Sequence, residues 1–251
     1  MTGTREHELL FVAGVARSGT TALRRILGNH PDIAVGMERY KRLWGERIGE
    51  LGPEHFERDR FFDYRDGLTN ITPDVPWAQE RLADLEAKWD TARYRGDKMT
   101  AIRARKIWQR FPQARFVFIV RDISLVASSW ERRAADASDT GWREGAGADR
   151  AVGAWNTAVR RVLDAVSARP EQAIALDYTR FFGEPSGAGL AAAMAFLDLD
   201  AAPIQADWQA AHDQYVESVA GRDRTLPPET AAYIAEHADL TAWRRLGELT
   251  V

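Results

Sequence analysis

The 251-residue chain has no cysteine, which excludes disulfide bonds, a thiolate nucleophile and cysteine-bound metal ions. Its five histidines are scattered without the spacing of metal ligands, so we expect chemistry that needs no bound metal. No apolar run approaches the roughly 20 residues of a membrane helix, and the polar start MTGTREHE is unlike a secretory signal. A cytoplasmic protein without a transmembrane segment is therefore expected.

The chain also lacks a strong excess of charge of either sign. The formal net charge is −3, with 28% charged and 45% hydrophobic residues, a composition typical of a globular protein with a sizeable core. This balance argues against a nucleic-acid partner, although the basic clusters ERYKR and RARKIWQR are candidates for anion sites. Neither an internal repeat nor a low-complexity linker interrupts the sequence, so we expect one domain over residues 1–251.

Apolar strand-like segments alternate with helical segments along the chain. ELLFVAGVA, DIAVGM, ARFVFIV and QAIALDY read as strands, and the Phe, Val and Ile of ARFVFIV are typical of a central parallel strand. The alternation predicts a three-layer α/β/α fold around a mainly parallel sheet. ERYKRLWGERIGEL predicts a further helix, residues 44–90 an acceptor-binding lobe, and the glycine-rich residues 138–148 a mobile loop.

A glycine-rich turn, GVARSGTT, follows the first predicted strand and precedes a helix. The spacing is that of a nucleoside-triphosphate phosphate loop, but Thr20 stands where such a loop has lysine. Backbone N–H groups at a helix N-terminus still suit an anion, and Arg17, Ser18 and Thr21 add a guanidinium and hydroxyls. The missing lysine argues against kinase or NTPase chemistry, and a turn without any ligand is the alternative.

RSGTT after a strand resembles the 5′-phosphosulfate loop of sulfotransferases that use 3′-phosphoadenosine 5′-phosphosulfate (PAPS). These enzymes have the P-loop nucleotide-kinase-like fold, and their loop carries Lys or Arg where Arg17 stands. The resemblance therefore implies PAPS as the sulfuryl donor. It assigns donor binding to Arg17, Ser18, Gly19, Thr20 and Thr21.

A second motif, FVFIVRDISLVASSW, resembles the 3′-phosphate motif of the same family. Arg121 stands at the end of the strand and Ser129 on the following helix, as in that motif, while Ile123 replaces the usual proline. The position agrees with the nucleotide site of doubly wound sheets, and a guanidinium can grip a phosphate with two hydrogen bonds. Ser128 in place of Ser129, or a purely structural Arg–Asp pair, is the alternative.

Two weaker matches lie toward the C-terminus. ALDYTRFF is similar to the family's strand end whose tyrosine lies near adenine, which implies that role for Tyr178, although Thr179 departs from the usual acidic residue. VAGRDRTLPPE resembles the loop that closes over the nucleotide and implies a contact from Arg222. Tyr178 is as well explained as a core aromatic residue.

Lys98, in GDKMT, matches the family segment that bears a catalytic lysine. The resemblance implies that Lys98 and Arg17 offset the negative charge that develops on the leaving oxygen. The histidine base of the cytosolic branch is absent, because Thr100 stands in its place. A solvated lysine at a strand end is the alternative for Lys98.

The carbohydrate and protein-tyrosine branch of the family places a glutamate just after the second strand, where this chain has Glu38. Glu38 would accept the proton of the acceptor hydroxyl if its pocket raised its pKa toward neutrality. Otherwise it is a helix N-terminal residue, stabilised by the helix dipole or paired with Arg42. Asp97 and His30 are reserve candidates for the base.

Together the motifs predict a metal-independent, PAPS-dependent sulfotransferase. Its acceptor would be a hydroxyl of a sugar, a glycolipid or a small metabolite, and adenosine 3′,5′-bisphosphate would be released. An ATP-dependent small-molecule kinase of the same architecture is one rival, which Thr20 opposes. A noncatalytic nucleotide-binding module is the other.

Overall fold

The computed structural model describes residues 7–136, 146–220 and 226–251. Within these ranges the strands form one sheet in the order β2-β3-β1-β4-β5. They are β1 (Glu8–Ala13), β2 (Ile33–Val35), β3 (Tyr94–Met99), β4 (Arg115–Val120) and β5 (Ala173–Asp177). Their pairings are all parallel, so the carboxyl ends of the strands lie along one edge. The predicted parallel sheet is confirmed.

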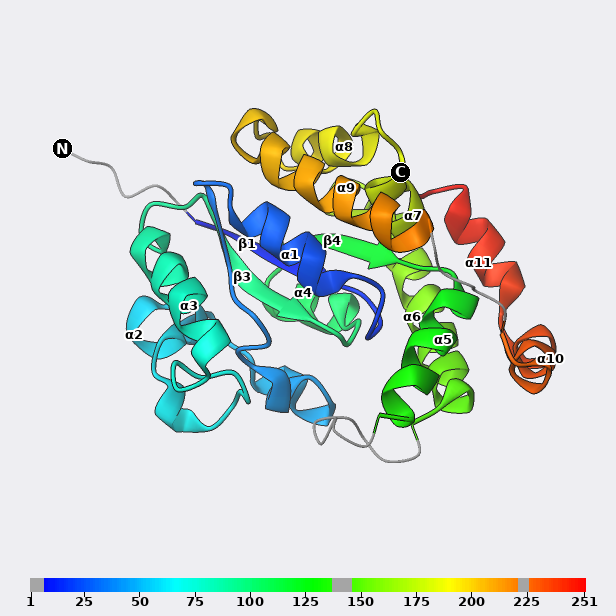
Figure 1. Ribbon diagram of the computed structural model, residues 1–251. Helices are drawn as coiled ribbons and strands as arrows, with labels where there is room; N and C mark the ends of the chain where they lie inside the picture. Colours follow the sequence, from blue (N-terminus) through cyan, green and yellow to red (C-terminus); the bar gives the residue numbers. More distant parts are fainter. Residues whose placement is uncertain (1–6, 137–145, 221–225) are drawn as a thin grey trace.

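Helices cover both faces of this sheet (Figure 1). One face carries α1 (Thr20–Gly28), α7 (Tyr178–Gly183), α8 (Ala188–Phe196) and α9 (Gln205–Ala220). The other carries α4 (Ala104–Arg110), α5 (Ile123–Ala134) and α6 (Ala148–Ala168), with α10 (Pro228–His237) and α11 (Leu240–Gly247) packed along α6. The three-layer α/β/α architecture expected from the sequence is therefore confirmed.

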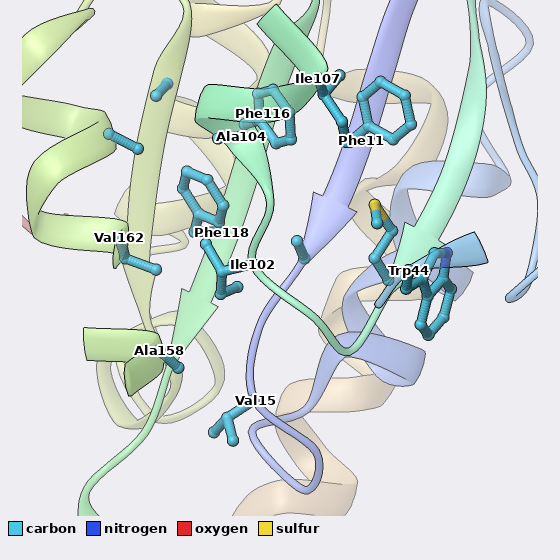
Figure 2. Close-up of a cluster of buried hydrophobic side chains, with 14 of the residues drawn as sticks. Phe11, Val15, Trp44, Ile102, Ala104, Ile107, Phe116, Phe118, Ala158 and Val162 are labelled. Atoms are coloured by element: carbon cyan, nitrogen blue, oxygen red, sulfur yellow. The ribbon is translucent and has the colours of Figure 1, made fainter. Parts of the chain in front are cut away.

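The core divides at the sheet because successive side chains of a strand point to opposite faces. Phe11 belongs to one buried cluster, whereas its neighbours Leu10 and Val12 belong to the other. Figure 2 shows Phe11, Phe116 and Phe118 on the face covered by α4 and α6. The ring centroids of Phe11 and Phe116 are 5.2 Å apart, and those of Phe116 and Phe118 are 5.4 Å apart. Coverage of both faces explains the nearly continuous apolar sequence of β4.

The segment between β2 and β3 differs from its prediction. In place of the helix expected from ERYKRLWGERIGEL, the chain forms two short 3-10 helices, η1 (Lys41–Leu43) and η2 (Glu46–Glu50). Glu38 has a φ of 59°, in the left-handed region, so a right-handed helix cannot begin there, and Gly45 separates the two turns. The helix prediction was wrong.

The rest of this lobe is built from short elements and one longer helix. They are η3 (Pro53–Phe56), α2 (Arg58–Phe61), η4 (Tyr64–Asp66) and α3 (Pro76–Lys88). In the loop predicted to be mobile, residues 138–145 lie outside the described residues, and α6 begins at Ala148. No helix in the described ranges is both long and apolar enough to cross a membrane.

Gly96 marks the closest approach of β3 to β1. A Cβ at this position would collide with the backbone carbonyl oxygen of Leu10, so a single methyl group would push the two strands apart. We expect Gly96→Ala to lower the free energy of unfolding, measured in urea, by about 3 kcal/mol, as overpacking of a core does.

Gly153→Ala is the matched control for this substitution. Gly153 lies in α6, and a Cβ there would meet nothing within 4 Å. Because glycine is unfavourable in a helix interior, this variant should be more stable by about 0.5–1 kcal/mol. Equal changes in the two variants would contradict the close strand approach.

Candidate active site

The polar side chains of the candidate site follow the carboxyl ends of neighbouring strands. The Gly14 amide after β1 donates to the carbonyl of Met99 in β3 at 3.3 Å, and the Glu38 amide after β2 donates to the carbonyl of Lys98 at 3.1 Å. These bonds tie the loop of GVARSGTT and the turn of Glu38 to the same strand. The sheet thus brings the GVARSGTT loop and Glu38 to the edge where doubly wound sheets bind nucleotides.

The loop after β1 is held in a constrained conformation. Gly19 has a φ of 92°, and a Cβ on it would lie 2.6 Å from the ring of Tyr178, while a Cβ on Gly14 would collide with the carbonyl of Ile119. Arg17 has a φ of 75°, which is unfavourable for a residue with a side chain. Tyr178 and Ile119 therefore restrict the shape of this loop, because they leave no room for a side chain at Gly19 or Gly14.

Three hydrogen bonds fasten the loop to β4 and α5. Arg17 donates from Nε to Ser129 Oγ at 3.0 Å, and Arg121 donates from a terminal guanidinium nitrogen to the Arg17 carbonyl at 3.0 Å. The Trp130 indole donates to the Ala16 carbonyl at 3.1 Å. The structure thus brings Arg17, Arg121 and Ser129 together. The hydrogen bond from Trp130 was not predicted, because an aromatic residue within a helix gives no sequence signal of such a bond.

Tyr178 is the first residue of α7 and lies beside the loop. The Arg121 guanidinium lies over its ring, 4.2 Å from the centroid, and its centroid is 5.0 Å from that of Phe182 and 5.6 Å from that of Tyr215. The ring is half-buried. It therefore belongs to an aromatic cluster while part of its surface stays accessible next to Gly19.

The groups around the N-terminus of α1 are those that an anion needs. Gly19 is the cap residue of the helix and, as a glycine, has no side chain that could accept the amides of the first turn. Ser18 is wholly buried, and its Oγ has no hydrogen-bond partner among the described residues. Arg17 and Arg121 add two guanidinium groups beside them. These residues fit the phosphosulfate and phosphate groups that the resemblance implies.

Lys98 and Glu38 form an ion pair at the ends of β3 and β2. Lys98 Nζ lies 2.6 Å from Glu38 Oε1, and the Lys98 side chain is only 3% exposed, which rules out a solvated strand-end lysine. Lys41 Nζ lies 2.8 Å from the other carboxylate oxygen, Oε2. Lys41 takes the place expected for Arg42, because the 3-10 turn brings the third residue, not the fourth, next to Glu38.

The two ammonium groups control the ionisation of Glu38. Burial raises the pKa of its carboxyl, but the charge of Lys98 and the hydrogen bonds from Lys41 and Lys98 outweigh burial and hold the pKa below its usual value. The condition that the pocket raise this pKa toward neutrality is therefore not met in this arrangement. Glu38 is ionised at neutral pH.

The two reserve bases have other partners. The Asp97 carboxylate is wholly buried, accepts the amides of Lys98 and Tyr40, and burial raises its pKa to about 6. His30 lies beyond the far end of α1, where Nδ1 accepts the Asp32 amide and Nε2 is 3.1 Å from the Asp200 carbonyl. Glu38 is thus the better placed candidate for the base.

The donor-binding, adenine-contact and base roles predicted for these residues stay predictions, as do two further expectations. Arg222 lies outside the described residues, so its contact with the nucleotide stays a prediction. Within the described ranges, no three His, Asp or Glu side chains gather as metal ligands. A reaction without metal likewise stays a prediction.

Comparison with known proteins gives one consistent family. The model of the sulfotransferase family matches residues 10–203. A protein-tyrosine sulfotransferase of Drosophila melanogaster is 31% identical over 122 residues, which cover 47% of this chain and 24% of that protein. A Caenorhabditis briggsae relative with a protein-tyrosine sulfotransferase name is 27% identical over 185 residues, 71% of this chain and 61% of the relative. The chain thus spans less than two thirds of these relatives.

Solved structures show the same fold. The sulfotransferase domain from the curacin biosynthetic pathway matches with a TM-score of 0.52 and 16% identity, over 98% of this chain and 93% of that chain. A mouse sulfotransferase complexed with PAP matches with a TM-score of 0.51 and 13% identity, over 97% and 82% of the two chains. At these identities the likeness establishes the fold.

The Glu38–Lys98 pair can be tested by a double-mutant cycle on stability. Glu38→Gln and Lys98→Met remove one charge each and keep the side-chain length. We expect a coupling free energy of about 1.5–3 kcal/mol in urea denaturation at pH 7.5, as for a charge-assisted hydrogen bond shielded from water. The exposed pair Arg47–Glu50, which is 2.8 Å long, should give a much smaller coupling. Equal coupling in the two cycles would mean that the buried pair does not form.

Proposed function

The chain belongs to the sulfotransferase family, and we propose that it transfers a sulfuryl group from PAPS to a hydroxyl group of an acceptor. The observation that carries this proposal is the buried Lys98–Glu38 pair at the strand edge that also holds the anion-binding loop. Bound PAPS would supply the sulfuryl group and depart as adenosine 3′,5′-bisphosphate. Such a transfer depends mainly on positioning and electrostatics, as phosphoryl transfer does.

The donor would be held along the ends of β1 and β4. In this proposal the 5′-phosphosulfate lies on the α1 N-terminus, held by Arg17, Ser18, Gly19, Thr20 and Thr21. Arg121 and Ser129 hold the 3′-phosphate, and Tyr178 contacts the adenine. The hydrogen bonds that join Arg17 to Ser129 and Arg121 to the Arg17 carbonyl support this arrangement, because they keep the two phosphate-binding groups adjacent.

The chemical step would use Glu38 and Lys98 in separate roles. Glu38 takes the proton of the acceptor hydroxyl while the acceptor oxygen bonds to sulfur and the bond from sulfur to the donor's bridging oxygen breaks. Lys98, with Arg17, offsets the negative charge on that bridging oxygen. Because Glu38 and Lys98 are paired in the free chain, movement of Lys98 toward the bridging oxygen frees the carboxylate to act as a base.

The acceptor would bind beside Glu38, against the lobe of residues 44–90. Lys41, whose side chain is 45% exposed, contacts the Glu38 carboxylate on the accessible side of the pair. Candidate acceptors are the hydroxyls of sugars, glycolipids and small metabolites, and the names of the curated relatives add the tyrosine side chain. A single domain, a cytoplasmic location and independence of metal ions stay predictions.

Donor binding can be measured by calorimetry with adenosine 3′,5′-bisphosphate. We expect the bisphosphate to bind more tightly than ATP with magnesium. Arg121→Ala should weaken binding by about 1.5–3 kcal/mol, because a charge-assisted contact is lost. Arg244→Ala is the control and should bind normally, because the Arg244 side chain is exposed and, among the described residues, hydrogen-bonds only within α11. A preference for ATP with magnesium, or no effect of Arg121→Ala, would contradict the proposed donor site.

The role of Glu38 can be tested by Glu38→Gln once an acceptor is in hand. We expect the turnover number to fall by about 10²–10⁴-fold, because the amide cannot accept the hydroxyl proton. The affinity for adenosine 3′,5′-bisphosphate should stay the same. Glu46→Gln, at an exposed position in the same lobe, is the matched control. Normal turnover of Glu38→Gln would remove this residue from the mechanism.

A further inference from the structure

Asp97 is a buried carboxylate next to the Glu38–Lys98 pair. The residue is 2% exposed, and a Cβ on Gly36 would lie 3.0 Å from its Oδ1, so β2 passes directly against it. Burial of a carboxylate is costly unless hydrogen bonds compensate for lost water. The raised pKa of Asp97, about 6, reflects that cost. An apolar residue at this position would avoid the cost of burial, so stability alone does not explain why a carboxylate is present.

Both carboxylate oxygens of Asp97 accept backbone amides. Oδ1 accepts the amide of Lys98 at 2.9 Å, and Oδ2 accepts the amide of Tyr40 at 3.2 Å. Tyr40 ends the turn that begins at Glu38, where the backbone is left-handed. The Glu38 amide is itself bonded to the Lys98 carbonyl at 3.1 Å. The turn is therefore tied to β3 on both sides of Arg39.

The charged groups around Asp97 do not replace these amide bonds. Lys98 directs its ammonium to Glu38, and Arg39 directs its guanidinium to Asp66 at 2.7 Å. Arg24 from α1 acts on Asp97 through its charge, and its own Nε donates to the Val35 carbonyl. The negative charge of Glu38 raises the pKa of Asp97, and the hydroxyls of Tyr40 and Tyr64 also interact with its carboxylate. Among the described residues, Asp97 thus accepts hydrogen bonds from the backbone of the turn and of β3 and from no side-chain cation.

We infer that Asp97 is a positioning residue: by holding the amides of Tyr40 and Lys98 together, it fixes the turn on β3 and keeps the Glu38 carboxylate within reach of Lys98. It contacts neither donor nor acceptor. This inference rests on the proposed function for its effect on turnover. The hydrogen bonds from the Tyr40 and Lys98 amides to Asp97 can be measured whether or not the proposed function is correct.

The first test is Asp97→Asn, which keeps the side-chain shape but offers one acceptor oxygen in place of two. Asparagine cannot accept both amides, so one of the two hydrogen bonds that hold the Tyr40 and Lys98 amides together is lost. The Lys98 amide keeps its second bond, to the Gly36 carbonyl, in either case. We expect turnover at saturating donor and acceptor to fall by about 10- to 100-fold, as for a small misplacement of a catalytic group. The affinity and stoichiometry of adenosine 3′,5′-bisphosphate binding should match the wild type.

Asp239→Asn is the matched control, because Asp239 caps α11 by accepting the Ala242 amide and lies outside the proposed machinery. Its turnover should be normal. Normal turnover of Asp97→Asn, or a loss of binding stoichiometry that equals its loss of turnover, would overturn the inference. The second result would mean that Asp97 is needed for folding and does not position Glu38 in the folded protein. A wild type that binds the bisphosphate and modifies no acceptor would instead count against the proposed function.

A second measurement uses the wild type and needs neither an acceptor nor a variant. If Asp97 accepts both amides, the ¹H resonances of the Tyr40 and Lys98 amides should shift with one shared midpoint, near the Asp97 pKa of about 6. Unrelated midpoints, or no shift of the Tyr40 amide, would overturn the inference. This measurement shows whether Asp97 holds both amides even if the Asp97→Asn variant does not fold.

Discussion

The parallel register between β2 and β3 is the constraint on which the rest of the site depends. Gly36 donates to Gly96 at 2.9 Å, Lys98 donates to Gly36 at 3.2 Å, and Glu38 donates to Lys98 at 3.1 Å, so the ladder runs past the end of β2. A shift of one residue would turn the Lys98 side chain to the opposite face. The register therefore decides whether Glu38 has a buried lysine beside it.

The electrostatic character of the site changes along the strand edge. Near α1 the groups are the helix N-terminus, whose cap residue Gly19 has no side chain, and the guanidinium groups of Arg17 and Arg121, which would suit a donor with several negative charges. Next to β2 the Glu38 carboxylate is balanced by Lys98 and Lys41. The attraction between the two charges is offset by the cost of removing both from water, so an apolar pair in their place would be about as stable. The position of the ion pair beside the loop after β1 is therefore better explained by chemistry.

Local sequence patterns predicted the fold and the position of the loop after β1 well. The alternation of strands and helices predicted the sheet, and GVARSGTT and FVFIVRDISLVASSW predicted the loop and the arginine that the structure brings together. The sequence was a poor guide to the turn after β2. Its apolar spacing suggested a helix, but the left-handed Glu38 and its ties to β3 override that preference. The lowered pKa of Glu38 depends on Lys98, a residue distant in sequence, and no local pattern reports such a partner.

Transfer of an isotope label from donor to acceptor is the most direct test of whether this strand edge transfers a sulfuryl group. The chain would be incubated with ³⁵S-labelled PAPS and a panel of sugar, glycolipid, phenol and tyrosine-peptide hydroxyls, with EDTA present, beside parallel reactions with γ-³²P-labelled ATP and magnesium. We expect ³⁵S in at least one acceptor, greatly reduced in Lys98→Met, and no ³²P in any. Transfer of ³²P without ³⁵S, or ³⁵S transfer that is unchanged in Lys98→Met, would contradict this expectation.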